Sequence, residues 1–539
     1  MEKRVSLNCA ACHVADVEVG DRRLRVDGAP AALDFDAFLA DLSTALRDTV
    51  QFADLRAKPT APSPRFLRFL SRVGVFNAGS KVPVPPETLA PQAVAFAQNF
   101  AGRAALRRPL HPSGPGRVDA LTQIVNSVAV KDLGIPTNHV TPAAPTSYPP
   151  LWLTSRLEFV QYNLAVADPL NRNLGQALGV FGQTTLKGPR SDLFKSNVDI
   201  IGLEDFERWS SDLSSPEWPA GAFGAIDAAL AGGGRDLFAA HCEGCHNAPN
   251  YRSTSASANL LGDQFIAVTA KLARVVGTDP VYTQALTERW VNVGPLAQMP
   301  RPVMLGDDGL TGAAITGAIE THLAGAGLDD TVLEGLEQDL LACIKAGGGA
   351  ACPHLPEAQT EPIFGSPILP AVAVLGPVVQ QTTLRKLREQ GLSRQEIAAK
   401  LRLRPRDHPD CLGENGQPAA APCGYQTPLA GMGLKAGPLE AVWTTGPYLH
   451  NGSVRTIYEL LSPPDERATE FWVGSRKVDP DHLGFVDERT EGAVRFDTTI
   501  PGNGNGGHVF WETPFSDEER LAIIEYLKDP RLFPLPADR

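Results

Sequence analysis

Two segments share one pattern, Cys9-Ala10-Ala11-Cys12-His13 and Cys242-Glu243-Gly244-Cys245-His246, and they decide how this chain is read. Two thiols separated by two residues can form thioether bonds to the two vinyl groups of one porphyrin, and the adjacent imidazole then reaches the iron. With 8 cysteines and 11 histidines in 539 residues, one such pattern is expected by chance roughly 0.002 times. Zinc is the alternative, but a structural zinc site needs four converging ligands and each segment offers three.

The two segments therefore predict two covalently bound haem c groups. The covalent anchors would be Cys9, Cys12, Cys242 and Cys245, and the proximal iron ligands would be His13 and His246. Haem attachment of this kind belongs outside the cytoplasm, so we expect a periplasmic or secreted protein. Residues 1–8 contain no apolar signal-peptide core, and we expect the natural chain to begin further upstream.

Composition narrows the class of protein. The formal net charge is -12, which argues against a nucleic-acid partner because phosphate binding needs a basic surface. The sequence has no apolar run long enough to span a bilayer. Its 46 prolines and 50 glycines are spread along the chain, which indicates a folded protein with many loops.

Four further cysteines form two pairs that are local in sequence, Cys343 with Cys352 and Cys411 with Cys423. Two disulfides would suit an oxidising compartment. Four buried free thiols are the alternative.

We expect a mainly α fold with little strand, built from two cytochrome c-like haem domains over residues 1–231 and 232–539. Residues 231–234, Ala-Gly-Gly-Gly, would mark the start of the second domain, and the Pro-rich residues 134–151 would form an extended loop. A capping-box pattern at Ser516 and Glu519 predicts the start of a terminal helix. Apolar spacing predicts helices over residues 33–55, 86–106, 152–165, 203–213, 235–241, 329–344, 384–401 and 516–528.

The sixth ligands decide the chemistry, because a haem with two strong protein ligands carries electrons and an open haem can bind O2 or peroxide. His450, in Gly446-Pro-Tyr-Leu-His450-Asn-Gly-Ser453, is one candidate, although it is equally readable as a surface histidine in a turn. Met299 lies 53 residues after His246 and is the rival. Met304 and Met432 are more typical of core gap-fillers.

Residues 14–230 offer no comparable sixth ligand, since His111 and His139 lie in Pro-rich loops. The first haem is therefore expected to be five-coordinate and reactive, with an apolar distal pocket. The aromatic candidates for that pocket are Trp152, Phe159, Tyr162 and Phe181, each of which could equally be ordinary core. Trp443 precedes His450 by seven residues and could pass electrons between haems or simply pack.

Several C-terminal segments carry a family resemblance. They are Lys435-Ala-Gly-Pro-Leu439, Trp443, Gly446–Val454, Tyr458–Leu461, Phe471–Arg476, Gly484-Phe485, Gly502–His508 and Glu525–Lys528. Weaker likeness covers Pro149–Gly182 and Gly277–Pro280. On these residues the chain resembles the dihaem cytochrome c peroxidase superfamily, and within it is most similar to the rubber oxygenases and their relatives.

The resemblance implies that the two haems have different functions. The second haem would have two histidine ligands, His246 and His450, and would relay electrons, which makes Met299 the weaker candidate. The first would be held by His13 alone and would bind O2 or peroxide on its open face. Trp152 and Phe159 remain our own candidates for that face and are not implied by the resemblance.

An O2-activating oxidoreductase acting on an apolar alkene, such as polyisoprene or a terpene, is the function that the resemblance favours. A dihaem cytochrome c peroxidase is the alternative, or a protein-modifying enzyme similar to the methylamine dehydrogenase maturation factor MauG. A pure electron carrier is a second alternative, which the length of the chain argues against. The expected partners are O2 or H2O2 and a small redox donor or acceptor.

Overall fold

A computed structural model of the chain describes residues 7–51, 86–256, 263–296, 368–401 and 431–533, apart from residues 249, 295, 393–395 and 398–399, together with Arg68 and Arg72. The described residues are 44% helical and 13% strand. The fold is therefore mixed, and the expected mainly α fold understated the strands. Periodicity missed them because they are two to six residues long, shorter than the windows in which alternation can be recognised.

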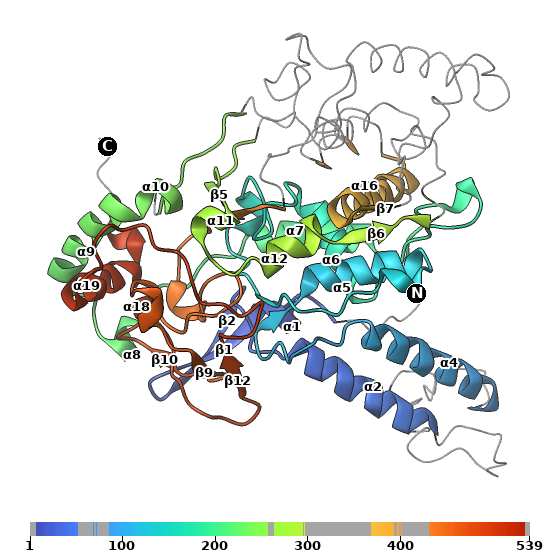
Figure 1. Ribbon diagram of the computed structural model, residues 1–539, viewed down its shortest axis with the longest axis horizontal. Coiled ribbons are helices and arrows are strands. Elements are labelled where there is room, and N and C mark those ends of the chain that lie inside the picture. Colours follow the sequence, from blue (N-terminus) through green and yellow to red (C-terminus); the bar gives the residue numbers. More distant parts are fainter. Residues whose placement is uncertain are drawn as a thin grey trace, which may run out of the picture.

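The helices that matter for the sites lie in three groups (Figure 1). Their bounds are α1 (Ala10–His13), α2 (Phe35–Gln51), α4 (Pro86–Ala105), α5 (Ala120–Asn126), α6 (Pro169–Val180), α7 (Ile200–Ser211), α8 (Ala220–Phe223), α9 (Ala228–His241), α10 (Glu243–His246), α11 (Ala273–Val276), α12 (Val281–Thr287), α16 (Ala371–Glu389), α18 (Ile457–Leu460) and α19 (Asp517–Leu527). Helices α5, α6, α12 and α16 pack together, α9 packs on α19, and α2 with α4 forms a pair that projects from the rest.

The described strands form two-stranded antiparallel sheets. The pairs are β1 (Val14–Val19) with β2 (Arg22–Asp27), β3 (Arg117–Val118) with β4 (Thr146–Ser147), β5 (Ala270–Leu272) with β8 (Gly433–Lys435), β6 (Trp290–Asn292) with β7 (Ile368–Pro370), β9 (Glu470–Val473) with β12 (Val494–Asp497), and β10 (Val478–Asp479) with β11 (Gly484–Phe485). Most join segments far apart in the chain, and β1 follows directly on the first Cys-x-x-Cys-His segment.

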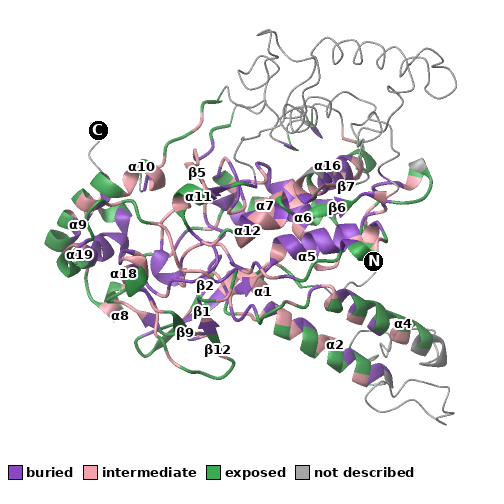
Figure 2. Ribbon diagram, viewed as in Figure 1, coloured by how far each residue is buried: buried purple, intermediate pink, exposed green. Residues whose placement is uncertain are grey.

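Figure 2 shows which parts of the fold are buried. The buried hydrophobic residues form three main clusters. One lies among α5, α6, α12 and α16, and a small one holds α2 against α4. Another joins β1, Trp152, Phe238, Trp443 and Tyr526. The first and the last of these clusters each contain residues from both sides of the expected boundary at residue 231. The two predicted domains therefore share their cores in the described part of the chain.

The Gly-rich stretch 231–234 lies inside a helix and does not separate two domains. Helix α9 begins at Ala228, where Asp227 accepts hydrogen bonds from the backbone of Ala229 and Leu230, and it continues through the glycines to His241. A Cβ atom at Gly234 would lie 1.9 Å from the carbonyl oxygen of Ala522 in α19. Glycine is therefore present here because two helices approach closely. A single sequence does not distinguish such a glycine from one in a loop between domains.

Most predicted helices are present, with shifted ends. Residues 35–51, 86–105, 200–211 and 517–527 are helical, and the capping box at Ser516 is confirmed. The helix expected over 152–165 is wrong. That segment has a short 3-10 turn at Thr154–Arg156, and Leu153, Gln161 and Leu164 have positive φ angles that no α-helix tolerates. The helix expected over 329–344 lies outside the described residues, and 134–151 is loop with one short turn and one short strand.

Candidate haem sites

The second Cys-x-x-Cys-His segment is presented by the end of α9. Cys242 caps that helix, and Cys245 and His246 donate backbone hydrogen bonds to the Cys242 carbonyl at 3.1 and 3.0 Å. The turn ends at Asn247, which is left-handed. The Nδ1 atom of His246 lies 3.1 Å from the Gly437 carbonyl oxygen, which fixes the ring and leaves Nε2 as the nitrogen available to iron. Burial lowers the pKa of His246, so the imidazole is neutral.

A second imidazole faces His246, and it belongs to His508. The two ring centres lie 6.2 Å apart with their planes inclined by 56°. Metal–nitrogen bonds of roughly 2 Å on each side would place the centres of two imidazoles that share one metal roughly 6 Å apart. The separation therefore matches an iron held between these rings. Within the described residues the Nδ1 atom of His508 is buried and has no hydrogen-bond partner.

The loop that carries His508 is shaped by glycine and by one carboxylate. Asp279 accepts hydrogen bonds from the backbone nitrogens of Gly502 at 2.9 Å and Gly504 at 3.0 Å. A Cβ atom at Gly507, where φ is +74°, would lie 2.3 Å from the Gly277 backbone. Only glycine permits this approach, and the loop then runs into His508, whose nitrogen donates to the Val276 carbonyl at 2.8 Å.

The segment around His450 supports this loop from the other side. Asn451 donates to the carbonyls of Gly502 and Gly504 at 3.1 and 3.0 Å, and Ser453 donates to Gly504 at 2.9 Å. The His450 ring packs against Tyr282, 5.6 Å away. His450, which was expected to bind iron, thus packs against Tyr282. Its neighbours Asn451 and Ser453 support the loop that carries His508.

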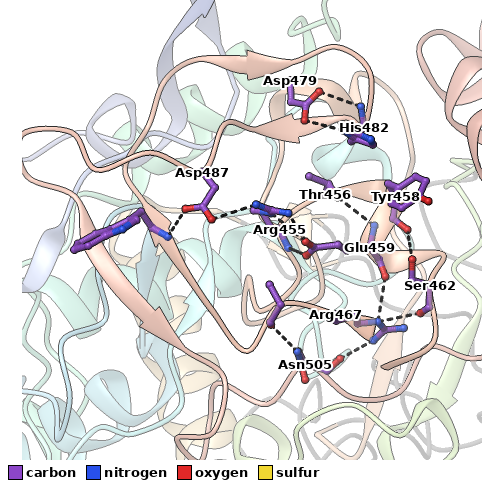
Figure 3. A network of polar contacts seen from close by, with 12 residues as sticks. Arg455, Thr456, Tyr458, Glu459, Ser462, Arg467, Asp479, His482, Asp487 and Asn505 are labelled. Carbon is purple, nitrogen blue, oxygen red and sulfur yellow. Dashed lines mark hydrogen bonds and ion pairs between the residues drawn. The ribbon is translucent and has the colours of Figure 1, made fainter. Parts of the chain in front are cut away.

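A polar network fixes the same loop to the C-terminal region (Figure 3). Arg467 donates to the Asn505 carbonyl at 2.6 Å and also to the carbonyls of Glu459 and Ser462. Asn505 donates in turn to the Ala468 carbonyl at 3.0 Å. Burial lowers the pKa of Arg467 to about 10, still far above neutrality. The guanidinium stays charged and holds the loop three residues before His508.

The first Cys-x-x-Cys-His segment has the same local geometry. Helix α1 forms one turn, in which His13 donates to the Cys9 carbonyl at 3.0 Å. The Nδ1 atom of His13 lies 2.9 Å from the Pro149 carbonyl oxygen, again leaving Nε2 for iron. Burial lowers the pKa of His13 to about 4, so this ring is neutral as well.

The surroundings of His13 differ from those of His246. Among the described residues, the ring recorded beside His13 is that of Tyr148, 6.2 Å away, and not a second imidazole. The Tyr148 hydroxyl donates to the Leu33 carbonyl at 3.1 Å, so it is already engaged.

The structure separates the aromatic candidates for the distal pocket. Trp152 is 1% exposed and touches Gly28, whose nitrogen donates to the His13 carbonyl, so it lies beside the first segment. Phe159 is buried in a small cluster with Leu164 and Ala167. The other two pack elsewhere: Tyr162 against Tyr282, and Phe181 against Phe100.

The side chains present fit haem c. Cys9, Cys12, Cys242 and Cys245 are free thiols. Among the described residues, no three His, Cys, Asp or Glu side chains converge on one point as a zinc ion requires. The indole nitrogens of Trp152 and Trp443 are buried and lack partners within the described chain, as expected of donors that face a missing acceptor.

Comparison with known proteins adds a family relationship. A family model described as RoxA-like, cytochrome c-like matches residues 433–473. The match supports a relationship to rubber-oxygenase-like dihaem cytochromes and implies covalently bound haem c.

Two relatives from Sinorhizobium fredii (strain NBRC 101917 / NGR234) extend the comparison. The uncharacterised protein y4iJ is 28% identical over 557 aligned positions, which cover 97% of this chain and 76% of the relative. The uncharacterised protein y4iM is 32% identical over 124 positions, covering 19% of this chain and 28% of the relative. The likeness to y4iJ thus extends over most of the chain.

Some sequence-based expectations fall outside the described residues. They concern Met299, Met304, Cys343, Cys352, Cys411 and Cys423. Met432 is described and is 46% exposed, which is unlike a core gap-filler. In the described part of the chain, no helix combines the length and apolarity needed to cross a bilayer.

Proposed function

We propose that this chain is a dihaem c-type oxidoreductase in which the two haems have different tasks. The observation that supports the proposal is the asymmetry between the segments: His246 faces a second imidazole at 6.2 Å, and His13 faces Tyr148. Two strong axial ligands suit electron transfer, and one ligand leaves an open face for a small molecule.

The relay haem would be held by Cys242 and Cys245, with His246 and His508 as axial ligands. Both imidazoles are neutral and buried, and His246 is oriented by a backbone carbonyl. The loop of His508 is held by Asp279, Asn451 and Arg467. Rigid ligands of this kind keep the geometry similar in both oxidation states, which favours fast electron transfer.

The reactive haem would be held by Cys9 and Cys12, with His13 as its proximal ligand. When bound, this group supplies the capacity to activate O2 or peroxide. The chain contributes a neutral imidazole fixed by Pro149. We propose that the buried, apolar side chains of Trp152 and Phe159 exclude water and accept a hydrocarbon on the reacting side.

The substrate class that we propose is an apolar alkene, cleaved with O2 as in the rubber oxygenases that the chain resembles. The RoxA-like match over residues 433–473 supports this choice. We place the protein in the periplasm or outside the cell, where haem c is attached.

Incubation of the haem-loaded chain with polyisoprene or a small terpene under air tests the proposal. Carbonyl cleavage products should form under air and not under nitrogen. The substrate assignment fails if no carbonyl product forms while H2O2 is consumed with a reduced donor, because that outcome identifies a peroxidase.

A His13→Ala variant provides the matched control. It should lose cleavage activity and keep the spectrum of the haem at His246, because the two ligands belong to different segments.

A further inference from the structure

Three buried polar atoms without partners converge beside the segment of His450. They are Nε of Arg117, Oγ of Ser147 and Nδ1 of His450, and within the described residues none has a hydrogen-bond partner. Arg117 is 2% and His450 7% exposed. Unpaired polar atoms in a protein interior are rare, and several in one place indicate an acceptor supplied from elsewhere.

Backbone contacts join these three residues, and the side chains of Arg117 and Ser147 lie together beside Gly452. Arg117 in β3 is paired in register with Ser147 in β4, and the Ser147 nitrogen donates to the His450 carbonyl at 2.9 Å. A Cβ atom at Gly452 would lie 2.7 Å from Ser147 Oγ and 3.8 Å from Arg117 Nε. Ser147 Oγ and Arg117 Nε therefore lie side by side against the Gly452 backbone, where a side chain at position 452 would displace them.

Arg117 gives the space a positive charge. Its guanidinium donates to the Ser113 carbonyl at 3.0 Å and to Oδ1 of Asn503 at 2.7 Å, and it lies 4.3 Å from the centre of the Phe496 ring. These three partners are neutral. The Asp279 carboxylate acts electrostatically on Arg117, but in the described chain the two form no ion pair, and Asp279 accepts hydrogen bonds from Gly502 and Gly504. A buried cation without a paired carboxylate is costly, so the site is suited to an anion.

The site lies two residues from the proximal contact of the first haem segment. Ser147 is followed by Tyr148, whose ring is 6.2 Å from that of His13, and by Pro149, whose carbonyl oxygen lies 2.9 Å from His13 Nδ1. A haem anchored at Cys9 and Cys12 would bring carboxylates close to this site.

We propose that Arg117, Ser147 and His450 bind a propionate carboxylate of the haem attached at Cys9 and Cys12. The proposal rests on the proposed function, since it requires that haem. It assigns to His450 a positioning role at the reactive haem, in place of a bond to iron.

Arg289 provides a matched control. It is also buried, 7% exposed, and its guanidinium donates to the neutral oxygens of Thr122, Asn126 and Asn138. Its Nε atom lacks a partner in the described chain as well. Among the described residues, the contacts of Arg289 place no second unpaired polar atom beside it. Loss of its charge should therefore not affect the binding of a propionate.

The test is a spectroelectrochemical titration of the haem-loaded full chain that resolves the midpoint potential of each haem. Arg117→Gln should shift the potential of the first haem to more negative values, because a lost positive charge favours the ferric state. Arg117→Lys should restore much of the wild-type potential. Arg289→Gln should leave both potentials unchanged.

If the Arg117→Gln variant does not fold, the Ser147→Ala variant tests the same proposal. It removes one hydroxyl with little change in volume, and it should also shift the first haem negatively, by less. The proposal is overturned if Arg117→Gln and Ser147→Ala leave the first potential unchanged, or if only the second haem responds. Mass spectrometry separates this failure from that of the proposed function, because a wild-type chain with no haem on Cys9 and Cys12 would overturn both.

Discussion

At the scale of single residues, the account depends on His508, for which the sequence predicted no role, and on His450, which was expected to bind iron. His508 follows the run Gly502-Asn-Gly-Asn-Gly-Gly507, and its ring lies opposite that of His246. His450 occupies the motif with the strongest family likeness and packs against Tyr282. His508 would bind iron, and His450 would bind a propionate.

His508→Ala should open the second haem. The ferric haem at His246 should change from low-spin to high-spin, because it loses its second strong ligand. Electron paramagnetic resonance of the oxidised protein measures the change.

His450→Asn is the control for that experiment, and it should leave the second haem low-spin. A high-spin second haem in His450→Asn, with an unchanged spectrum in His508→Ala, would restore His450 as the ligand.

The anchors and proximal ligands could be predicted from sequence because their spacing is local and chemically determined. The sixth ligand that we propose could not be, because the position of His508 depends on contacts across more than 200 residues, such as Asp279 with Gly502 and Gly504. Its signal was the Gly-rich run 502–507, which predicts a tightly packed loop but not the direction of the next side chain.

At the scale of elements, two glycines in α9 should behave in opposite ways. A Cβ atom at Gly232 meets nothing within 4 Å, and one at Gly234 meets the Ala522 carbonyl at 1.9 Å. Gly232→Ala should stabilise the protein by up to about 1 kcal/mol, because alanine is the better helix former.

Gly234→Ala should instead destabilise the protein, because α19 must move away from α9. Chemical denaturation of both variants measures the free energies of unfolding. Equal effects of the two substitutions would contradict the packing described here.

The loop before His508 permits a similar comparison. Gly507 and Gly492 have φ angles of +74° and +79°, and only Gly507 has backbone atoms in the path of a Cβ. Both alanine variants carry left-handed strain of roughly 1 kcal/mol. Gly507→Ala should cost more stability and also weaken the low-spin signal of the second haem, whereas Gly492→Ala should leave that signal intact.

Asp132, at the end of the π-helical turn Ser127–Asp132, should make stability depend on pH. Burial raises the pKa of its carboxyl from 3.8 to about 7. The stability that protonation contributes is present at low pH and is lost as pH rises through about 7. Asp132→Asn should therefore raise Tm relative to wild type by more at pH 8 than at pH 5. An equal difference at both pH values would contradict the assignment.

Elements were predictable where an amphipathic pattern was long, as in α2 and α7, or where a capping box marked the first turn, as in α19. They were not predictable over 152–165, where positive φ angles at Leu153, Gln161 and Leu164 break a helix-like pattern. Such angles are imposed by tertiary contacts, which outweigh local propensity.

At the scale of the whole molecule, the two haem segments lie in one body. The cluster that contains Trp152 and Trp443 also contains residues of β1 and of α9, the elements next to the two Cys-x-x-Cys-His segments. The sequence repeat that predicted two haem domains describes the attachment motifs and not the packing, because both main cores draw on both halves of the chain.

The central claim is that one haem is open and the other is closed. Titration of the dithionite-reduced, haem-loaded chain with carbon monoxide tests it most directly, with haem content determined in the same sample. We expect two haems per chain and one carbon monoxide bound per chain. Two bound would show that His508 does not close the second haem, and none bound would show a six-coordinate electron carrier; either result would contradict the account.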